Sequence, residues 1–205
     1  MPSILIVDDH PAICFALKAT LEANDDFFVT TTTDGGQVMA LIREIQPDLI
    51  ILDIALLKLD GLDLLTRIKH YSAATRVLIL TGQPAEIYAA RSLKAGAAGF
   101  LSKQHVLTAI DAVVRLLLDG YYCFPAECLT PEKMPPVVDN SELLMRISDR
   151  EITVLRYLAE GKTNKEIAEL LQLSNKTIST YKARLLEKSG AGSLAELLAQ
   201  FKDMT

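Results

Sequence analysis

Five polar side chains in the first half of the chain are of types that handle phosphate and divalent cations, and each follows a short apolar stretch. They are Asp8, Asp9, Asp53, Thr81 and Lys103. Three carboxylates repel one another unless a hard cation lies among them. A neighbouring lysine can neutralise a transferred phosphoryl group. The residue types therefore predict a site for Mg²⁺ and a phosphoryl group, provided that the fold brings the five together.

Four apolar stretches must form the elements that hold these side chains. They cover residues 4–7, 49–52, 77–80 and 99–102. Unbroken runs of Val, Ile and Leu that alternate with helix-length segments are typical of a parallel sheet covered on both faces, which is a doubly wound α/β domain. The carboxyl ends of parallel strands meet at one edge of the sheet, and ligands bind there. We therefore expect the five side chains to lie close together.

These residue types also fit two other interpretations. A single acidic residue after a strand is more often a helix cap or a turn former than a reactive group, but that interpretation explains Asp53 only in isolation. A phosphatase of the haloacid dehalogenase type also needs an acid cluster, a hydroxyl and a lysine. It has its nucleophile in an Asp-x-Asp arrangement after the first strand, whereas here the first acids are adjacent and Asp53 lies 44 positions after Asp9. The pattern disfavours such a phosphatase.

With these five positions in order, residues 3–120 resemble the receiver domains of two-component response regulators. The resemblance implies a flavodoxin-like domain with a parallel sheet of five strands. It also implies that Asp53 accepts a phosphoryl group. The implied ligands of Mg²⁺ are Asp8, Asp9, Asp53 and the backbone carbonyl of Ala55. The implied switch residues that sense the phosphoryl group are Thr81, Phe100 and Lys103.

The loop after the phosphoacceptor departs from the usual pattern of this family. In the stretch 56–59, Leu57 stands where the family commonly has a proline. We expect this loop to be less rigid, although no side chain that does chemistry is lost. Gly82 follows Thr81 and leaves room for a phosphoryl group. His10 follows the acid pair and is expected to cap a helix or to line the edge of the site.

Length and composition agree with two small domains in a cytoplasmic protein. The chain has 205 residues, half of them apolar, and no apolar run reaches the roughly 18 residues that a membrane span needs. Met1 leads almost directly into the first expected strand, without a targeting segment. Cys14, Cys123 and Cys128 lack the spacing of metal ligands, so buried or linker thiols are expected.

Proline and glycine residues predict where one domain ends and the other begins. A helical pattern at 107–118 closes at Gly120, and four prolines then fall within residues 125–136. Such a stretch is typical of a semi-extended linker. The predicted organisation is a receiver domain at 1–120, a linker at 121–143 and a second domain at 144–205.

Capping residues divide the second domain into helices. Ser148 and Glu151 match a capping box at the start of the first helix. Thr163 can cap a second helix, and Ser174 can cap a third after a short turn. Two helices joined by a turn of three or four residues form a helix-turn-helix, in which the second helix enters the major groove of DNA. The expected second domain is therefore all α-helical.

The helix that follows Ser174 has an apolar stripe and a polar face. Ile178, Tyr181 and Leu185 recur at helical spacing and are expected to face the core. Residues 174–188 hold four basic side chains against one acidic one. This local charge answers the objection that a formal net charge of -5 disfavours a nucleic-acid binder. An ordinary solvated helix has the same spacing, so the pattern alone leaves DNA binding open.

Residues 143–201 resemble the four-helix DNA-binding domain of LuxR/FixJ-type (NarL-type) regulators, through motifs at 163–168 and 173–178. The sequence is especially similar to the BvgA/EvgA branch. The resemblance implies that the last helix, which starts at Ser193, serves as a dimer contact. The residues expected to contact DNA are Lys176, Thr177, Ser179, Thr180, Lys182 and Arg184.

The sequence thus predicts a DNA-binding transcriptional regulator, not an enzyme, that phosphoryl transfer from a sensor histidine kinase activates. Regulators of the similar branch respond to hybrid kinases, which implies a multistep relay. Further expected partners are a second copy of the chain, DNA and RNA polymerase, and no membrane. Two alternatives stay open. One is a constitutive DNA-binding regulator whose receiver is not phosphorylated, and the other is a receiver that acts by protein contact, with the C-terminal helices as a platform for partners.

Overall fold

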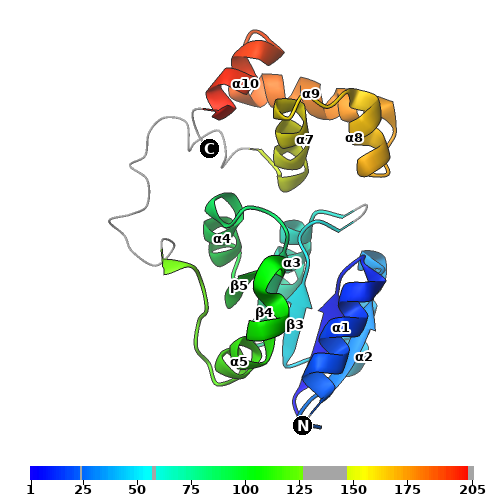
Figure 1. Cartoon of the computed structure of the whole chain (residues 1–205), viewed down its shortest axis with the longest axis vertical. Coiled ribbons are helices and arrows are strands. Elements are labelled where there is room, and N and C mark those ends of the chain that lie inside the picture. Colours follow the sequence, from blue (N-terminus) through cyan, green and yellow to red (C-terminus); the bar gives the residue numbers. More distant parts are fainter. Residues whose placement is uncertain (24, 57–58, 127–146, 203–205) are drawn as a thin grey trace. The chain divides into compact units, whose positions relative to one another are not determined.

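The computed structural model describes residues 1–23, 25–56, 59–126 and 147–202. It divides the chain into two compact units, Met1–Pro131 and Glu132–Thr205, each of which is described by itself (Figure 1). The loop position Leu57 and most of the expected linker at 121–143, with Cys128, lie outside the described residues. Within the described part, no helix is both long and apolar enough to cross a membrane.

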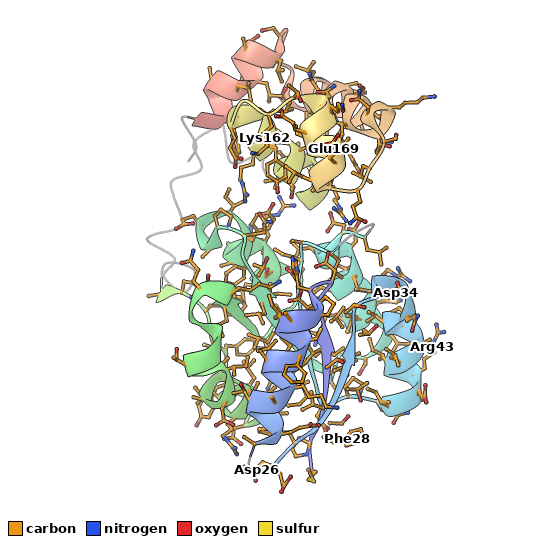
Figure 2. All side chains as sticks on the ribbon, turned by 45° about the vertical axis from the view of Figure 1, so that its right-hand side comes forward. Asp26, Phe28, Asp34, Arg43, Lys162 and Glu169 are labelled. Carbon is orange, nitrogen blue, oxygen red and sulfur yellow. The ribbon has the colours of Figure 1, made fainter. Side chains whose placement is uncertain are left out.

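The N-terminal unit is built on a parallel sheet of five strands, which confirms the predicted fold class. The strands run in the order β2-β1-β3-β4-β5, so the chain starts in the interior strand β1, adds β2 on one side and then adds β3, β4 and β5 on the other. Their bounds are Ser3–Val7 for β1, Phe28–Thr32 for β2, Leu49–Leu52 for β3, Arg76–Thr81 for β4 and Gly99–Ser102 for β5. Phe28, on the outer strand β2, is largely exposed (Figure 2).

Helices cover both faces of this sheet. One face packs under α1 and α5, and their apolar side chains share a core with alternate residues of β1, β3 and β4. The other alternate residues of these strands are equally buried, which explains why the strands read as unbroken apolar runs. The helices are Pro11–Glu22 (α1), Val38–Ile45 (α2), Gly61–Tyr71 (α3), Ala85–Lys94 (α4) and Val106–Leu118 (α5), with 3₁₀ turns at Gly35–Gln37 and Lys103–His105.

Helix α3 begins in close contact with the loop that follows β3. The side chain of Asp60 caps the helix by accepting hydrogen bonds from the backbone N–H groups of Leu62 and Asp63, at 3.0 and 3.3 Å. Gly61 comes next, and a Cβ at this position would lie 2.3 Å from the Cα of Ile54. Only glycine allows this approach. The start of α3 is therefore pressed against the residue that follows Asp53.

We expect Gly61→Ala to destabilise the N-terminal unit by about 3 kcal/mol, because the backbone of Ile54 must move to admit the methyl group. Amide hydrogen exchange of β3 and β4 in the full chain measures the free energy of unfolding of this unit. Gly82→Ala is the matched control, since a Cβ there meets nothing within 4 Å. Equal loss in both variants, or no loss in Gly61→Ala, would contradict the close packing at Ile54.

The chain continues along the outer edge of β5 after α5 ends. Cys123 pairs in parallel with Gly99. The backbone N–H of Phe100 donates to the carbonyl of Cys123 at 2.8 Å, and the N–H of Cys123 donates to the carbonyl of Ala98 at 3.1 Å. The first residues of the expected linker are thus hydrogen-bonded to the sheet. Cys14 and Cys123 are both free thiols, and Cys14 is buried.

The described part of the C-terminal unit is all α-helical, and it confirms the predicted helix starts. Its helices are Asp149–Ala159 (α7), Asn164–Leu170 (α8), Asn175–Ser189 (α9) and Leu194–Lys202 (α10). Ser148, Thr163 and Ser174 each accept a backbone hydrogen bond as the capping residue, and the first two complete capping boxes. Ile178 and Leu185 are fully buried, as predicted, whereas Tyr181 is only half-buried.

Glu151 joins two helices of this unit. Its carboxylate accepts from the backbone N–H of Ser148 at 2.7 Å, and the Lys188 ammonium donates to the same oxygen at 2.7 Å. Glu151 is only 2% exposed. Burial alone would raise the pKa of Glu151, but the hydrogen bonds and charge of Lys188, with the hydrogen bonds of Ser148, outweigh it and lower the pKa. The start of α7 is thereby tied to the end of α9.

We expect Glu151→Gln to destabilise the C-terminal unit by about 2 kcal/mol at neutral pH, because the ion pair between the buried Glu151 carboxylate and Lys188 is lost. Since folding lowers the pKa of Glu151, this stabilisation is present above the unfolded value, near 4.5, and disappears as pH falls through the folded pKa. Hydrogen exchange of α7 and α9 at pH 7 and pH 4 measures both effects. Glu166→Gln, at the exposed capping box of α8, should lose much less stability, and equal losses in the two variants would exclude the ion pair with Lys188 as the cause.

Candidate functional site

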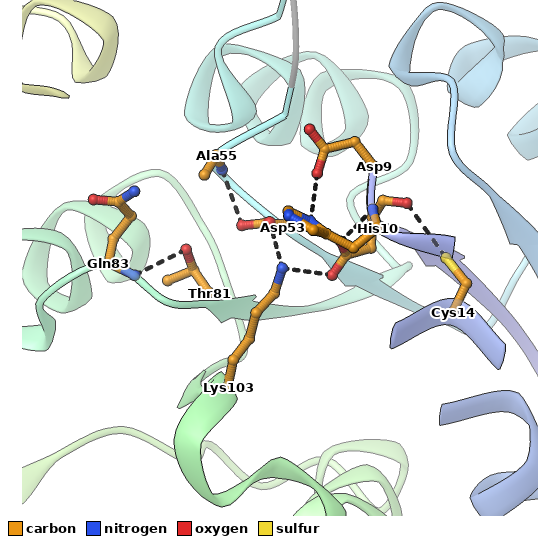
Figure 3. A network of polar contacts seen from close by, with 9 residues as sticks. Asp9, His10, Cys14, Asp53, Ala55, Thr81, Gln83 and Lys103 are labelled. Atoms are coloured by element: carbon orange, nitrogen blue, oxygen red, sulfur yellow. Dashed lines mark hydrogen bonds and ion pairs between the residues drawn. The ribbon is translucent and has the colours of Figure 1, made fainter. Parts of the chain in front are cut away.

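The polar residues that follow the strands meet at the carboxyl edge of the sheet. Asp8 and Asp53 are almost fully buried there. The ammonium of Lys103, just after β5, lies 2.7 Å from Asp8 Oδ2 and 2.6 Å from Asp53 Oδ2, so it bridges the two carboxylates (Figure 3). Three separate stretches of the sequence thus supply one compact cluster of charges.

Lys103 stays charged within this cluster. Burial by itself would lower the pKa of the Lys103 ammonium, but the charge and hydrogen bond of Asp53, together with those of Asp8, outweigh burial and raise the pKa above its usual value. The ammonium therefore compensates two buried carboxylates. A cation or a phosphoryl group that enters this cluster must change the partners of Lys103.

Asp9 and His10 extend the cluster toward solvent. His10 Nδ1 lies 2.8 Å from Asp9 Oδ1 and 3.0 Å from Asp8 Oδ1. His10 stands at the capping position of α1, yet its side chain makes no capping bond. Of its two expected roles, it therefore lines the edge of the site. Ligand atoms of Asp8, Asp9, His10 and Asp53 all lie within 4.8 Å of one another. Three carboxylates in that space are a donor set that fits a hard divalent cation such as Mg²⁺.

The other predicted residues of this site lie around Asp53. The backbone N–H of Ala55 donates to Asp53 Oδ1 at 2.9 Å, which fixes that carboxylate oxygen. Thr81 is fully buried at the end of β4, and its hydroxyl accepts from the backbone N–H of Gln83 at 3.2 Å (Figure 3). Phe100 is buried on the neighbouring strand β5.

Helix α9 presents most of the predicted DNA-contacting side chains to solvent. Lys176, Ser179, Thr180 and Arg184 are exposed. The hydroxyls of Ser179 and Thr180 donate to backbone carbonyls one turn earlier, of Asn175 at 3.1 Å and of Lys176 at 3.0 Å. The hydroxyl oxygens keep acceptor capacity, and the Thr180 methyl group is available for apolar contact. This is a small, polar and basic surface.

Three of the side chains predicted to contact DNA form hydrogen bonds with neighbouring side chains. The Lys182 ammonium donates to Asn164 Oδ1 at 3.3 Å, and Asn164 Nδ2 donates to Ser179 Oγ at 3.4 Å. Asn164 thus connects the start of α8 to two residues of α9. Thr177 is half-buried, and its hydroxyl lies 2.8 Å from Ser174 Oγ in the cap of α9.

Comparison with known proteins identifies both units. The response regulator receiver domain matches residues 4–115, and the model for bacterial regulatory proteins of the luxR family matches residues 145–200. The chain belongs to the LuxR-type response regulators. This response regulator therefore combines a receiver domain with a helix-turn-helix DNA-binding domain, and it is a transcription regulator.

Relatives with similar sequences align with this chain over nearly their whole length. BvgA of Bordetella pertussis, a positive transcription regulator of virulence factors, is 41% identical over 95% of this chain and 94% of its own. The fimbriae Z protein of Salmonella typhimurium is 42% identical over 96% of this chain and 94% of its own. The transcriptional activator EvgA of Escherichia coli is 32% identical over 94% of each chain. The predicted likeness to the BvgA/EvgA branch is confirmed.

Solved structures of a related regulator agree over nearly the whole chain. The RcsB response regulator of Salmonella typhimurium matches with a TM-score of 0.61 and 25% identity, covering 98% of this chain and all of that one. A complex of the response regulator RcsB with DNA matches with a TM-score of 0.59 and 25% identity, covering 100% and 99%. RcsB is thus a DNA-bound example of a similar chain.

Three hydrogen bonds in this response regulator, made by Gln83 and Asn164, were not predicted from the sequence. The hydrogen bond to the Thr81 hydroxyl comes from the backbone N–H of Gln83. Every residue except proline has such a donor, so the residue type at position 83 does not predict this bond. Asn164 is a polar residue directly after the capping residue of α8, in the helix-turn-helix, so its position suggests a role at the DNA-binding surface. Its spacing in the sequence does not, however, predict the bonds to Lys182 and Ser179.

Proposed function

We propose that this response regulator is switched by transfer of a phosphoryl group to Asp53. The observation that carries the proposal is the Lys103 ammonium, which contacts both Asp8 and Asp53 at the edge of the receiver sheet. A buried aspartate whose charge is balanced by a lysine, beside two further carboxylates, is suited to accept a phosphoryl group and to stabilise the product.

The carboxylate of Asp53 would attack the phosphorus of a phospho-histidine or a small acyl phosphate in line with the leaving group. Bound Mg²⁺ would offset the negative charge on the carboxylates and the transferring group. Asp8, Asp9, Asp53 and the Ala55 carbonyl would hold it. Lys103 would exchange a carboxylate contact for a phosphoryl oxygen. The Ala55 N–H already orients one oxygen of Asp53, which leaves the other to react.

The new charge would then act on Thr81 and Phe100. The hydroxyl of Thr81 accepts from the Gln83 N–H in the unphosphorylated chain. It would turn toward the phosphoryl group as a donor, and Phe100 would move into the space that Thr81 leaves. Phe100 is buried on β5. A shift of its ring would therefore move the residues that pack against it and alter the surface next to β4 and β5. Phosphorylation would thus bias a surface with two states rather than build a new one.

This surface would favour a homodimer, whose two α9 helices read half-sites about one helical turn apart on DNA. The donor would be a sensor histidine kinase, and the likeness to BvgA and EvgA favours one of the hybrid type. RNA polymerase is a further proposed partner. Since the target is bacterial DNA, the protein would act in the cytoplasm.

The proposal is tested by light scattering of the full chain with acetyl phosphate and Mg²⁺. We expect phosphorylation to strengthen dimerisation about tenfold. Thr81→Ala should be phosphorylated like the parent but gain little in dimerisation, because Thr81 reads the phosphoryl group and does not accept it. Thr66→Ala, an exposed position on α3, is the control and should respond like the parent.

Two results would redirect the proposal. A dimer of equal affinity with and without phosphate would favour a constitutive DNA-binding regulator. A Thr81→Ala variant that is phosphorylated and dimerises like the parent would show that the hydroxyl is not part of the switch. Retention of the chain on DNA, measured as a function of salt concentration, tests the remaining alternative. Retention that falls with salt is expected for a switched or a constitutive DNA-binding regulator, and not for a chain that acts by protein contact alone.

A further inference from the structure

The imidazole of His10 faces the carboxylates of the acidic cluster from its solvent side. The side chain is 63% exposed, yet Nδ1 lies 2.8 Å from Asp9 Oδ1 and 3.0 Å from Asp8 Oδ1. A ring that is this exposed at the start of α1 could also turn away into water. Its contacts instead bring a nitrogen donor to one oxygen of each of two residues that are proposed to hold Mg²⁺.

These separations are those of neighbouring ligands around one metal ion. Ligand atoms about 2.1 Å from an octahedral cation lie about 3 Å from one another. Nδ1 and the two carboxylate oxygens meet this requirement, and Asp53 also offers an oxygen within the 4.8 Å span of the cluster. The four residues together supply three oxygen donors and one nitrogen donor.

We propose that His10 is a ligand that gives this site a preference for borderline cations such as Co²⁺ over Mg²⁺. The inference rests on the proposed Mg²⁺ site and deepens it by naming the class of cation. Mg²⁺ favours oxygen ligands and gains little from an imidazole, whereas first-row transition metals gain substantially. A borderline cation held through His10 would compete with Mg²⁺ at Asp53.

A simpler role would give His10 the same position without a metal. Nδ1 can donate a hydrogen bond to the carboxylates, or it can direct a lone pair at a cation held between them. In the simpler role, loss of the ring changes the affinity for every divalent cation in the same direction and to a similar extent. As a ligand, His10 acts on transition metals selectively, and its nitrogen is detectable on the bound ion.

Calorimetric titration of the full chain with Co²⁺ and with Mg²⁺ separates the two roles. We expect His10→Ala to lose roughly tenfold or more in Co²⁺ affinity and to change by less than roughly threefold in Mg²⁺ affinity. His10→Gln should behave like His10→Ala, because its amide keeps a hydrogen bond to the carboxylates but is a poor ligand. His70→Ala, an exposed histidine on α3, is the control and should match the parent.

Electron spin echo modulation of the Mn²⁺-loaded chain is the second measurement. The parent and His70→Ala should show modulation from a coordinated ¹⁴N nucleus, and both His10 variants should lack it. Equal changes in Co²⁺ and Mg²⁺ affinity, or no nitrogen on Mn²⁺ in the parent, would overturn the inference. Labelling by acetyl phosphate and Mg²⁺ tests the proposed function separately. If the parent is labelled but the His10 variants show no selective change in metal affinity, phosphorylation of Asp53 stands and only the inference about His10 is rejected.

Discussion

Asp53→Asn is expected to abolish phosphorylation by acetyl phosphate, with a loss of more than about a hundredfold in rate. An amide has nearly the shape of the carboxylate, so the chain should keep its fold, but the amide oxygen is a far weaker nucleophile. Lys103 also keeps Asp8 as a partner in this variant, which limits the structural change. Intact-protein mass spectrometry before and after incubation measures the labelled fraction.

Removal of divalent cations should have an effect of similar size on the parent chain. Without a metal, the approach of an anionic phosphate to Asp8, Asp9 and Asp53 is opposed by three carboxylates and favoured by Lys103 alone in the cluster. EDTA should therefore suppress labelling, and added Mg²⁺ should restore it. Asp63→Asn, an exposed acid on α3, is the control and should label like the parent.

The contrary result has a clear structural meaning. If Asp53→Asn is labelled at the parent rate, the acceptor lies elsewhere, and Asp8 is the next buried carboxylate in contact with Lys103. If EDTA leaves labelling unchanged, Lys103 compensates the charge without a metal. Either outcome would require a different division of roles among the same residues.

The receiver sheet and its strand-end residues could be predicted from sequence because burial on both faces leaves a plain signature. Each strand from β1 to β4 that ends in a site residue is an unbroken apolar run, so the position of Asp8, Asp53 or Thr81 follows from where the run stops. Parallel strands then deliver these side chains to one edge. Topology, rather than any local pattern, brings Lys103 to Asp53 across 50 positions.

The orientation of His10 could not be predicted in the same way. A histidine before a helix is compatible with capping, with solvent or with the site, and the sequence left the first and last of these open. The choice depends on where Asp8 and Asp9 direct their oxygens, which is a matter of side-chain geometry. Backbone donors such as the Gln83 N–H carry no sequence signal at all.

The start of the linker shows a different limit. Gly120 and the prolines after it are typical of a segment without regular structure, yet Cys123 pairs with the edge strand β5. Gly99 makes this possible, because a Cβ at that position would lie only 3.0 Å from the carbonyl oxygen of Cys123. This pairing depends on the unpaired backbone N–H and C=O groups along the edge of β5. The residue types at 121–124 do not predict it.

Substitutions on α9 are expected to separate sequence reading from general DNA affinity. Thr180 is exposed, and its hydroxyl is already bonded to the helix backbone, so its methyl group and oxygen lone pairs can meet base edges. Thr180→Ala should weaken operator binding by about 1 to 3 kcal/mol, with little change on scrambled DNA. Ser179→Ala should act in the same direction, although Ser179 also receives a bond from Asn164.

Lys182→Ala should instead weaken binding to all duplexes and lower the salt slope by about one unit, as expected for a phosphate contact. To reach a phosphate, the ammonium must leave Asn164 Oδ1, a bond of 3.3 Å that is weak enough to exchange. Asn164→Ala should therefore keep the salt slope of the parent, because it frees Lys182 without removing its charge. Lys94→Ala, on the receiver helix α4, is the control for charge alone.

Binding titrations at two salt concentrations make these distinctions, with an operator enriched from random duplexes and a scrambled duplex. Equal losses on both duplexes for Thr180→Ala and Ser179→Ala would show that this face of α9 does not read sequence. Recognition would then move to the amino end of the helix, around Asn175 and Lys176. Lys176 is exposed there, next to the cap in which Ser174 bonds to Thr177, so its ammonium is available to contact a base pair.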